Sequence, residues 1–242
     1  MINRILAEER FKQYVSNYDS SNSKIIRKIE HSYRVSKLSK KIAGNLKLPK
    51  EEISLAQLIG LLHDIGRFEQ VKKYNTFKDY LSVDHADLGV EILKKDDYIS
   101  NYCNDKEYKT IILESIRNHN KYKIDPNLKD KTLMHAKIIR DADKIDILNI
   151  IANENNKVFK ELSISKNILE SFYKKKLIKN EEKITKLDYL IGSLALVFDM
   201  NFNVSFEILQ EKDYLNKIAD KITVSEKENI KSFLNKYISE RV

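Results

Sequence analysis

Histidine and aspartate residues recur over the first 143 positions in a pattern that could bind metal ions. His63 and Asp64 are adjacent at the end of an apolar segment. Burying a carboxylate beside an imidazole there costs free energy unless a cation compensates. Imidazole nitrogen and carboxylate oxygen are both good ligands for divalent transition ions. The same residue types occur at His31, His85, His119 and Asp143. We therefore expect a metal site assembled from several segments of the chain.

The order of these residues resembles that of the HD superfamily of metal-dependent phosphohydrolases, whose ligands follow the order H, HD, H, H, D. The tetrad His-Asp-Ile-Gly at residues 63–66 is especially characteristic. The resemblance covers about residues 24–150, roughly half of the chain. The local sequences that carry it are His31-Ser32-Tyr33-Arg34-Val35, Leu61-Leu62-His63-Asp64-Ile65-Gly66-Arg67, Ile116-Arg117-Asn118-His119-Asn120 and Ala142-Asp143-Lys144.

The resemblance implies a set of metal ligands by position. His85 and His119 match the additional histidines of a subgroup with two metal ions. In that subgroup the aspartate of the HD pair, here Asp64, bridges the ions. The residues implied for the first ion are His31, His63, Asp64 and Asp143.

Asp141 and His135 are not among the ligands that the resemblance implies. The choice of Asp143 over Asp141 rests on the sequence Ala-Asp-Lys. Asp141 would then orient a ligand or pair with Lys144. His135 matches no position of the pattern, and we interpret it as a structural residue.

The chemistry implied by such a site is hydrolysis at phosphorus. Two ions about 3.5 to 4 Å apart would activate a bridging water for attack and neutralise phosphate oxygens. Imidazole-rich coordination disfavours Mg²⁺ and suits Mn²⁺, Fe²⁺, Co²⁺, Ni²⁺ or Zn²⁺, among which the residues do not choose. Basic side chains would hold the remaining phosphate charge, unless they are ordinary surface or structural cations. The candidates are Lys144 and Arg67 for catalysis beside Asp64, and Arg34, Lys121 and Lys144 for substrate binding.

The substrate expected from the resemblance is a small phosphorylated molecule such as a nucleotide. An aromatic segment with Tyr74, Asn75 and Phe77 could stack on a nucleobase, although packing on the core explains it as well. The chain lacks the Gly-Tyr-Pro motif of the cyclic-di-GMP phosphodiesterases of this superfamily. Two alternatives stay open. One is a mixed-valence di-iron oxygenase with the same six ligands, and the other is a non-catalytic module that binds a nucleotide or a metal.

The elements that must position these residues are expected to be helices. Only 5 Gly and 2 Pro occur in 242 residues, which disfavours turn-rich β folds and favours an all-α fold. Gly66 should end the helix from Lys50, and residues 67–83 should form a loop. Ser23, Asp84 and the pair Ser225 and Glu228 are expected helix caps. The helices expected are 3–17, 24–46, 50–65, 85–94, 107–119, 132–152, 187–198 and one at the C-terminus.

Composition and charge indicate the domain organisation, the class of partner and the location expected for the protein. We expect one all-helical domain over residues 1–242, with an HD core at about 24–150, a C-terminal helical extension at about 155–242 and a weak boundary at 153–157. The net charge of +8 comes from interspersed charges with 36 Lys and 8 Arg, so a nucleic-acid partner is not expected. A lone Cys103, no signal peptide and no apolar run long enough to span a membrane favour a cytoplasmic protein. The sequence does not indicate an oligomeric state.

Overall fold

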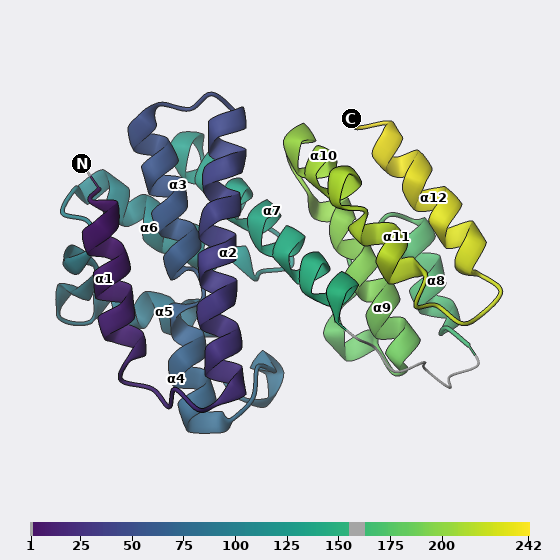
Figure 1. The fold of residues 1–242 in the computed structure, drawn as a ribbon, viewed down its shortest axis with the longest axis horizontal. Helices are drawn as coiled ribbons and strands as arrows, with labels where there is room; N and C mark the ends of the chain where they lie inside the picture. The colour runs from purple at the N-terminus through teal and green to yellow at the C-terminus, as the bar shows by residue number, and fades with distance from the viewer. Residues whose placement is uncertain (1, 155–162) are drawn as a thin grey trace. The chain divides into compact units, whose positions relative to one another are not determined.

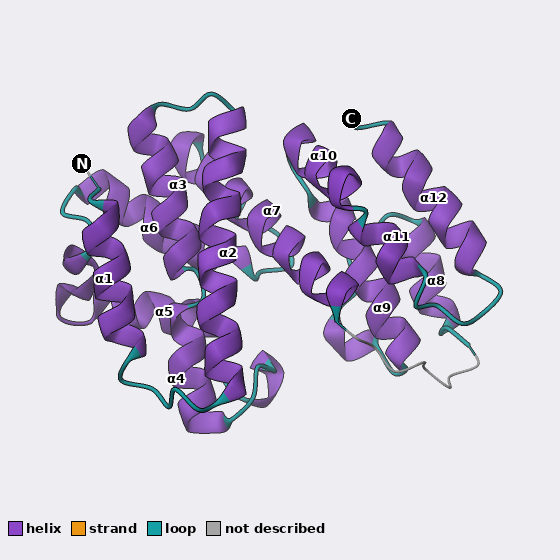
Figure 2. Ribbon diagram, viewed as in Figure 1, coloured by secondary structure: helices purple, strands orange, loops and turns teal. Residues whose placement is uncertain are grey.

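The computed structural model describes residues 2–154 and 163–242, which are folded almost entirely into helices (Figure 2). No β-strand occurs within these two ranges, so the all-α expectation is confirmed. None of the helices in them combines the length and apolarity needed to cross a membrane. The chain groups into two compact units, unit 1 (Met1–Asp143) and unit 2 (Lys144–Val242). The expectation of a single domain stays a prediction, and the boundary expected at 153–157 lies mostly outside the described residues.

All six expected metal ligands lie in unit 1, on or next to its helices. Most of the expected helices are present, with ends shifted by one or two residues. Helix α7 begins in unit 1 and continues past Asp143 into unit 2. The elements are α1 (Arg4–Val15), α2 (Ser23–Asn45), α3 (Lys50–Leu62), α4 (Ile65–Tyr74), η1 (Asp79–Leu81), α5 (His85–Lys94), η2 (Lys95–Asn101), α6 (Lys106–His119) and α7 (Asp130–Asn153).

Helices α2 and α3 form an antiparallel pair (Figure 1). Val35 and Ile42 lie on one face of α2 and are fully buried. Gly60 of α3 lets the two backbones approach closely. A Cβ atom at this position would lie 2.7 Å from the Ser39 hydroxyl and 2.8 Å from the Ser36 Cα atom. The close contact fixes α2 against the end of α3, where His63 follows.

Gly66 does not end a helix, and residues 67–83 are not one loop, so both expectations are wrong. Helix α3 ends at Leu62, and α4 begins at Ile65 and contains Gly66 in its first turn. A Cβ atom on Gly66 would lie 2.2 Å from the carbonyl oxygen of His85 and 2.6 Å from the amide nitrogen of Gly89. Glycine is therefore required here because α4 and α5 touch, not because a helix stops.

Of the two helix caps expected in unit 1, one is present in the structure and the other is not. Asp84 caps α5 as expected, since its carboxylate accepts hydrogen bonds from the amides of Ala86 and Asp87 at 2.9 and 3.1 Å. For α2 the cap is Asn22, whose side chain accepts from the Lys24 amide at 2.9 Å. Ser23 is already the first helical residue, so its assignment as the cap is wrong.

Unit 2 has its own buried core. Helix α9 packs against α8 and α11, and α11 packs against α10 and α12. Aromatic side chains meet in this core, with the rings of Phe172, Phe198 and Phe233 in mutual contact. The elements described here besides the end of α7 are α8 (Lys166–Tyr173), η3 (Asn180–Glu182), α9 (Lys186–Leu194), η4 (Ala195–Asp199), α10 (Asn203–Lys212), α11 (Tyr214–Ala219) and α12 (Lys227–Ser239).

The capping box in unit 2 lies on a different helix from the one expected. Thr185 and Asp188 form a reciprocal box at the start of α9. Helix α12 begins after Glu226, and no described side chain caps its first amides. The hydroxyl of Ser225 instead donates to the Glu226 carboxylate at 3.2 Å. The capping box predicted from Ser225 and Glu228 is therefore wrong.

Candidate metal centre

The six expected ligands lie at or near helix ends or in the middle of a long helix. His63 and Asp64 occupy the break between α3 and α4, which frees both side chains to point in one direction. His85 is the first residue of α5, and His119 is the last residue of α6. His31 lies in α2 and Asp143 in α7. All four histidines and Asp64 are at most 3% exposed, whereas the side chain of Asp143 is 15% exposed, so the cluster is largely but not completely shielded from bulk water.

One group of ligand atoms surrounds the first half of the site. The Nε2 atoms of His31 and His63 are 3.2 Å apart. Oδ2 of Asp64 lies 3.4 Å from His31 Nε2 and 3.5 Å from His63 Nε2. Oδ1 of Asp143 lies 3.1 and 3.6 Å from the same two nitrogens. The four side chains implied for a first ion thus converge on one small volume.

A second group meets the opposite oxygen of Asp64. The Nε2 atoms of His85 and His119 are 3.0 Å apart. Oδ1 of Asp64 lies 3.3 Å from His85 Nε2 and 3.7 Å from His119 Nε2. The two oxygens of this carboxylate therefore face two different histidine pairs. That is the arrangement expected of a carboxylate placed between two cations.

Hydrogen bonds on the far side of three rings fix which nitrogen carries the proton. Nδ1 of His63 donates to the Gly60 carbonyl at 2.8 Å, and Nδ1 of His119 donates to the Ile116 carbonyl at 2.7 Å. Nδ1 of His85 donates to the carboxylate of Asp79 at 2.6 Å. In the neutral imidazoles Nε2 is then an acceptor with a free lone pair. Buried lone pairs and carboxylates facing one another need a cation, so the donor set fits metal ions.

The electrostatics of the site favour charged carboxylates beside the neutral rings of His63 and His85. Burial alone would raise the pKa of Asp64, but Lys28 and the neighbouring histidines hold it well below its usual range. Burial would likewise raise the pKa of Asp143, and the neighbouring rings of His31 and His63 hold that pKa well below its usual range. Burial lowers the pKa of His63, and burial with the charge of Arg67 lowers the pKa of His85 to about 4. These protonation states are the ones metal ligands require.

Lys28 is a residue of the site that the sequence analysis missed. Its ammonium nitrogen lies 2.6 Å from Asp64 Oδ2, and its side chain is 16% exposed. Lys28 precedes His31 by three residues on α2, so both side chains lie on the same helix face. That spacing was the available signal, but Lys28 belongs to none of the local sequences that carry the resemblance.

Asp79 and Arg67 form a second layer around His85, and Asp79 was also missed. Nη1 of Arg67 donates to Asp79 Oδ1, the Phe77 carbonyl and Gln70 Oε1, each at 2.7 Å. Nε of Arg67 lies 3.6 Å from Asp64 Oδ1. Arg67 therefore ties the segment after α4 to the site. With residues 67–83 expected to be a loop, nothing in the sequence indicated that the carboxylate of Asp79 lies beside His85.

The other expected cations have carboxylate partners. Arg34 lies 3.8 Å from Glu30, one turn away on α2. Nζ of Lys121 lies 2.7 Å from both Asp84 and Asp87, at the start of α5. In unit 2, Lys144 is 2.8 Å from Asp199. Their predicted contacts with substrate stay predictions.

The remaining candidates are placed as follows. Asp141 is fully buried, whereas Asp143 is the carboxylate that lies beside His31 and His63. His135 is buried and bonds to Glu52 at 2.6 Å, which agrees with a structural role. In the aromatic segment, Tyr74 is 46% exposed, while the ring of Phe77 lies 5.2 Å from Lys28 Nζ.

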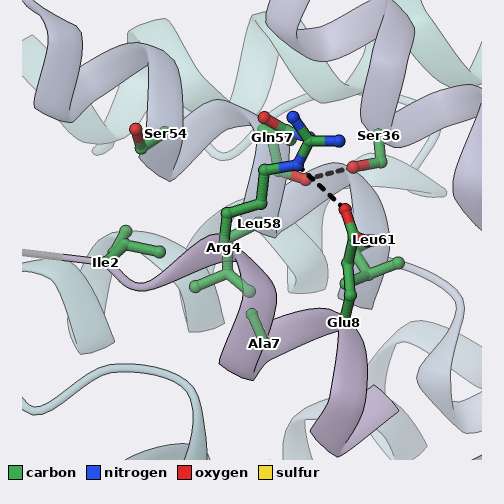
Figure 3. A pocket seen from close by; sticks show the side chains of 9 residues that line it. All are labelled: Ile2, Arg4, Ala7, Glu8, Ser36, Ser54, Gln57, Leu58 and Leu61. Atoms are coloured by element: carbon green, nitrogen blue, oxygen red, sulfur yellow. Dashed lines mark hydrogen bonds and ion pairs between the residues drawn. The ribbon is translucent and has the colours of Figure 1, made fainter. Parts of the chain in front are cut away.

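A separate pocket in unit 1 has no cluster of histidines and carboxylates among its lining residues. It lies among α1, α2 and α3 and is lined by apolar side chains, such as Leu58 and Leu61, together with polar ones (Figure 3). Several of its polar groups are already paired, because Arg4 binds Glu8 at 2.9 Å and the Ser36 hydroxyl donates to the Gln57 carbonyl at 2.8 Å. The clustered histidines and aspartates are therefore the better candidate for a functional site.

Comparison with known proteins agrees with the geometry. The family model described as the HD domain matches residues 29–148. The matched segment begins two residues before His31 and ends five residues after Asp143, so it includes all six clustered side chains. The chain has no significant match among curated proteins or among solved structures.

Proposed function

Residues 29–148 are an HD domain, the domain of a superfamily of metal-dependent phosphohydrolases, and from this we propose that the protein hydrolyses a small phosphorylated substrate. The bond cleaved is a phosphoester or phosphoanhydride, and the substrate class is a nucleotide or a nucleotide-like molecule. The observation that carries the proposal is the position of Asp64, whose two oxygens face separate histidine pairs at 3.3 to 3.7 Å.

The proposed ligand set follows from these distances. A first ion would be held by His31, His63, Asp64 and Asp143, and a second by Asp64, His85 and His119. When bound, divalent transition ions at such a site supply an activated water and neutralise charge on phosphate oxygens. A set rich in imidazole suits Mn²⁺, Fe²⁺, Co²⁺, Ni²⁺ or Zn²⁺ better than Mg²⁺.

The protein's own residues would exclude water and hold phosphate charge. Burial of the ligand cluster strengthens each electrostatic interaction within it. Arg67 places a positive charge near Asp64, and we propose that it helps to orient the reacting groups. Arg34, Lys121 and Lys144 remain proposed contacts to substrate. Each of them now lies beside a carboxylate, with which a phosphate oxygen would compete or share the cation.

The test is product release over a panel of nucleoside phosphates, cyclic and linear dinucleotides and dinucleoside polyphosphates. It should be run without O₂, with Mn²⁺, Fe²⁺, Co²⁺ or Ni²⁺ supplied in turn. Asp64→Asn should lose turnover and metal while retaining its helical circular dichroism. Asp96→Asn is the matched control, since Asp96 is exposed and asparagine tolerates its left-handed backbone.

Each outcome has a distinct meaning. Anaerobic turnover that vanishes in Asp64→Asn supports hydrolysis and identifies the substrate. Turnover that requires O₂ would replace the proposal with the di-iron oxygenase alternative. Nucleotide binding without turnover in any metal would indicate a non-catalytic binding module.

A further inference from the structure

The ammonium group of Lys28 occupies a position that a metal ion would also need. Nζ lies 2.6 Å from Asp64 Oδ2, the oxygen that faces His31 and His63. Both groups are well shielded, since the Lys28 side chain is 16% exposed and that of Asp64 is 3% exposed. A buried ion pair this short compensates the charge of Asp64 in the protein without metal.

A divalent ion and this ammonium group cannot share the oxygen without repulsion. A metal ion sits about 2.1 Å from a carboxylate oxygen. The two cations would then be within about 5 Å of each other in a poorly screened interior, where like charges repel strongly. Binding of the ion at His31, His63 and Asp64 should therefore displace the ammonium group from Asp64.

The side chain of Lys28 is less constrained by hydrogen bonds than that of Arg67, the other cation near Asp64. Arg67 is held by three acceptors, on Gln70, Phe77 and Asp79. For Lys28, the contacts found at its nitrogen are Asp64 and the ring of Phe77, 5.2 Å from the ring centre. A lysine has four flexible methylene groups, so its ammonium can move by several ångströms while its backbone stays on α2. Lys28 is thus the movable charge of the site and Arg67 the fixed one.

We propose that Lys28 holds Asp64 in place of a cation in the metal-free protein and binds a phosphate oxygen of the substrate once metal is bound. The inference rests on the proposed function for its second half only. A phosphate group on the first ion would bring negative charge to the place where the displaced ammonium needs a partner. Lys28 would thereby favour substrates with a free anionic phosphoryl group at this position.

The first half is tested by metal binding without any substrate. Lys28→Met keeps the length of the side chain and removes its charge, and Lys40→Met makes the same change at an exposed position of α2. Isothermal titration with Mn²⁺ should show affinity for the first ion rising roughly fivefold or more in Lys28→Met, because a competing ion pair is gone. The Lys40→Met affinity should equal that of the wild type. An unchanged or lower affinity in Lys28→Met would overturn the competition.

The second half is tested with inorganic phosphate on the Mn²⁺-loaded protein. Lys28→Met should bind phosphate about tenfold more weakly than the wild type, whereas Lys28→Arg should stay within about threefold of it. Equal phosphate affinity in wild type and Lys28→Met would overturn this half. Circular dichroism checks folding, and Lys28→Gln replaces Lys28→Met in both titrations if the methionine variant does not fold.

These results separate the inference from the proposed function. If the wild type hydrolyses nothing on the panel while Lys28→Met gains Mn²⁺ affinity, the competition stands and the proposed function is wrong. If the wild type turns over a substrate while the phosphate affinity of Lys28→Met is unchanged, the assignment of Lys28 is wrong and the proposed function stands. Failure of the wild type and both variants to bind Mn²⁺ would overturn both.

Discussion

Asp79 holds His85 by a short hydrogen bond, with Oδ2 of the carboxylate 2.6 Å from Nδ1 of the ring. The same carboxylate accepts from Arg67 at 2.7 Å and from Gln70 at 2.9 Å through its other oxygen. Burial alone would raise the pKa of Asp79, but His85 and Arg67 lower it far below its ordinary value. Asp79 is therefore charged at neutral pH and fixes both the tautomer and the orientation of His85.

Asp79→Asn should weaken the second metal site and leave the first intact. An amide is a poorer partner for the ring N–H than a carboxylate, and loss of such a partner typically lowers metal affinity about 10- to 100-fold. In an isothermal titration with Mn²⁺, only the transition that belongs to the second site should shift. The control is Asp19→Asn, which changes an exposed carboxylate. Equal shifts of both transitions would mean that Asp79 supports the fold rather than His85.

Histidine substitutions should distinguish one ion from two. His119→Gln removes a proposed ligand of the second ion alone, so the metal content of the purified protein should fall by about half. His135→Gln is the matched change at a buried histidine that bonds to Glu52. It should lower stability without changing the metal content. Elemental analysis after dialysis measures both, and an unaltered content in His119→Gln would reduce the site to a single ion.

The grouping of the six ligands could be predicted because their types and order repeat a known pattern. The structure brings His31, His63, Asp64, His85, His119 and Asp143 together, as expected. Lys28 and Asp79 could not be found in that way. Neither belongs to the pattern, and their roles depend on distances between helices that sequence spacing does not contain.

Gly66 shows a different limit of sequence reasoning. Glycine is common just after a helix, and that tendency suggested an end at this position. In the structure Gly66 has a negative φ and lies inside α4, beside the carbonyl of His85. Glycine is required at this position because α4 and α5 touch, and a rule about residues that follow a helix takes no account of such a tertiary contact. Because the helix was expected to end at Gly66, residues 67–83 were wrongly expected to form a loop.

Gly66→Ala should disturb the site through this contact. The added methyl would meet backbone atoms of α5 at 2.2 and 2.6 Å, which cannot move as a side-chain tip can. Overpacking of this kind costs about 1 to 3 kcal/mol and should displace His85. Urea unfolding followed by circular dichroism gives the free energy, and Mn²⁺ titration reports on the second ion.

Gly44→Ala is the matched control for that substitution. Gly44 also lies within a helix, α2, but no described atom beyond its own helix backbone and chain neighbours lies within 4 Å of a Cβ placed there. Alanine should stabilise the helix by about 0.5 to 1 kcal/mol through its propensity alone. Equal effects of the two substitutions would contradict the proposed contact between α4 and α5.

Asp188 should make the stability of unit 2 depend on pH in the acid range. Its buried carboxylate accepts hydrogen bonds from the amides of Ser165, Ile184 and Thr185 at 2.9 to 3.0 Å. Burial alone would raise the pKa of Asp188, and these amides lower it below its ordinary value of 3.8. A carboxylate with a lower pKa in the folded state stabilises the fold above its unfolded pKa. That stability is lost as the pH falls through the folded pKa.

The expected result is a loss of protection from hydrogen exchange at the amides of α9 as the pH falls below about 4. Asp188→Asn should lower stability at pH 7 by about 1.5 to 3 kcal/mol, since several hydrogen bonds to a charged group are weakened, and should flatten the acid dependence. Asp220→Asn alters a carboxylate that is 57% exposed and pairs with Lys231, so it should change stability by less than about 1 kcal/mol. If Asp188→Asn kept the acid dependence of the wild type, another carboxylate of unit 2 would have to cause it.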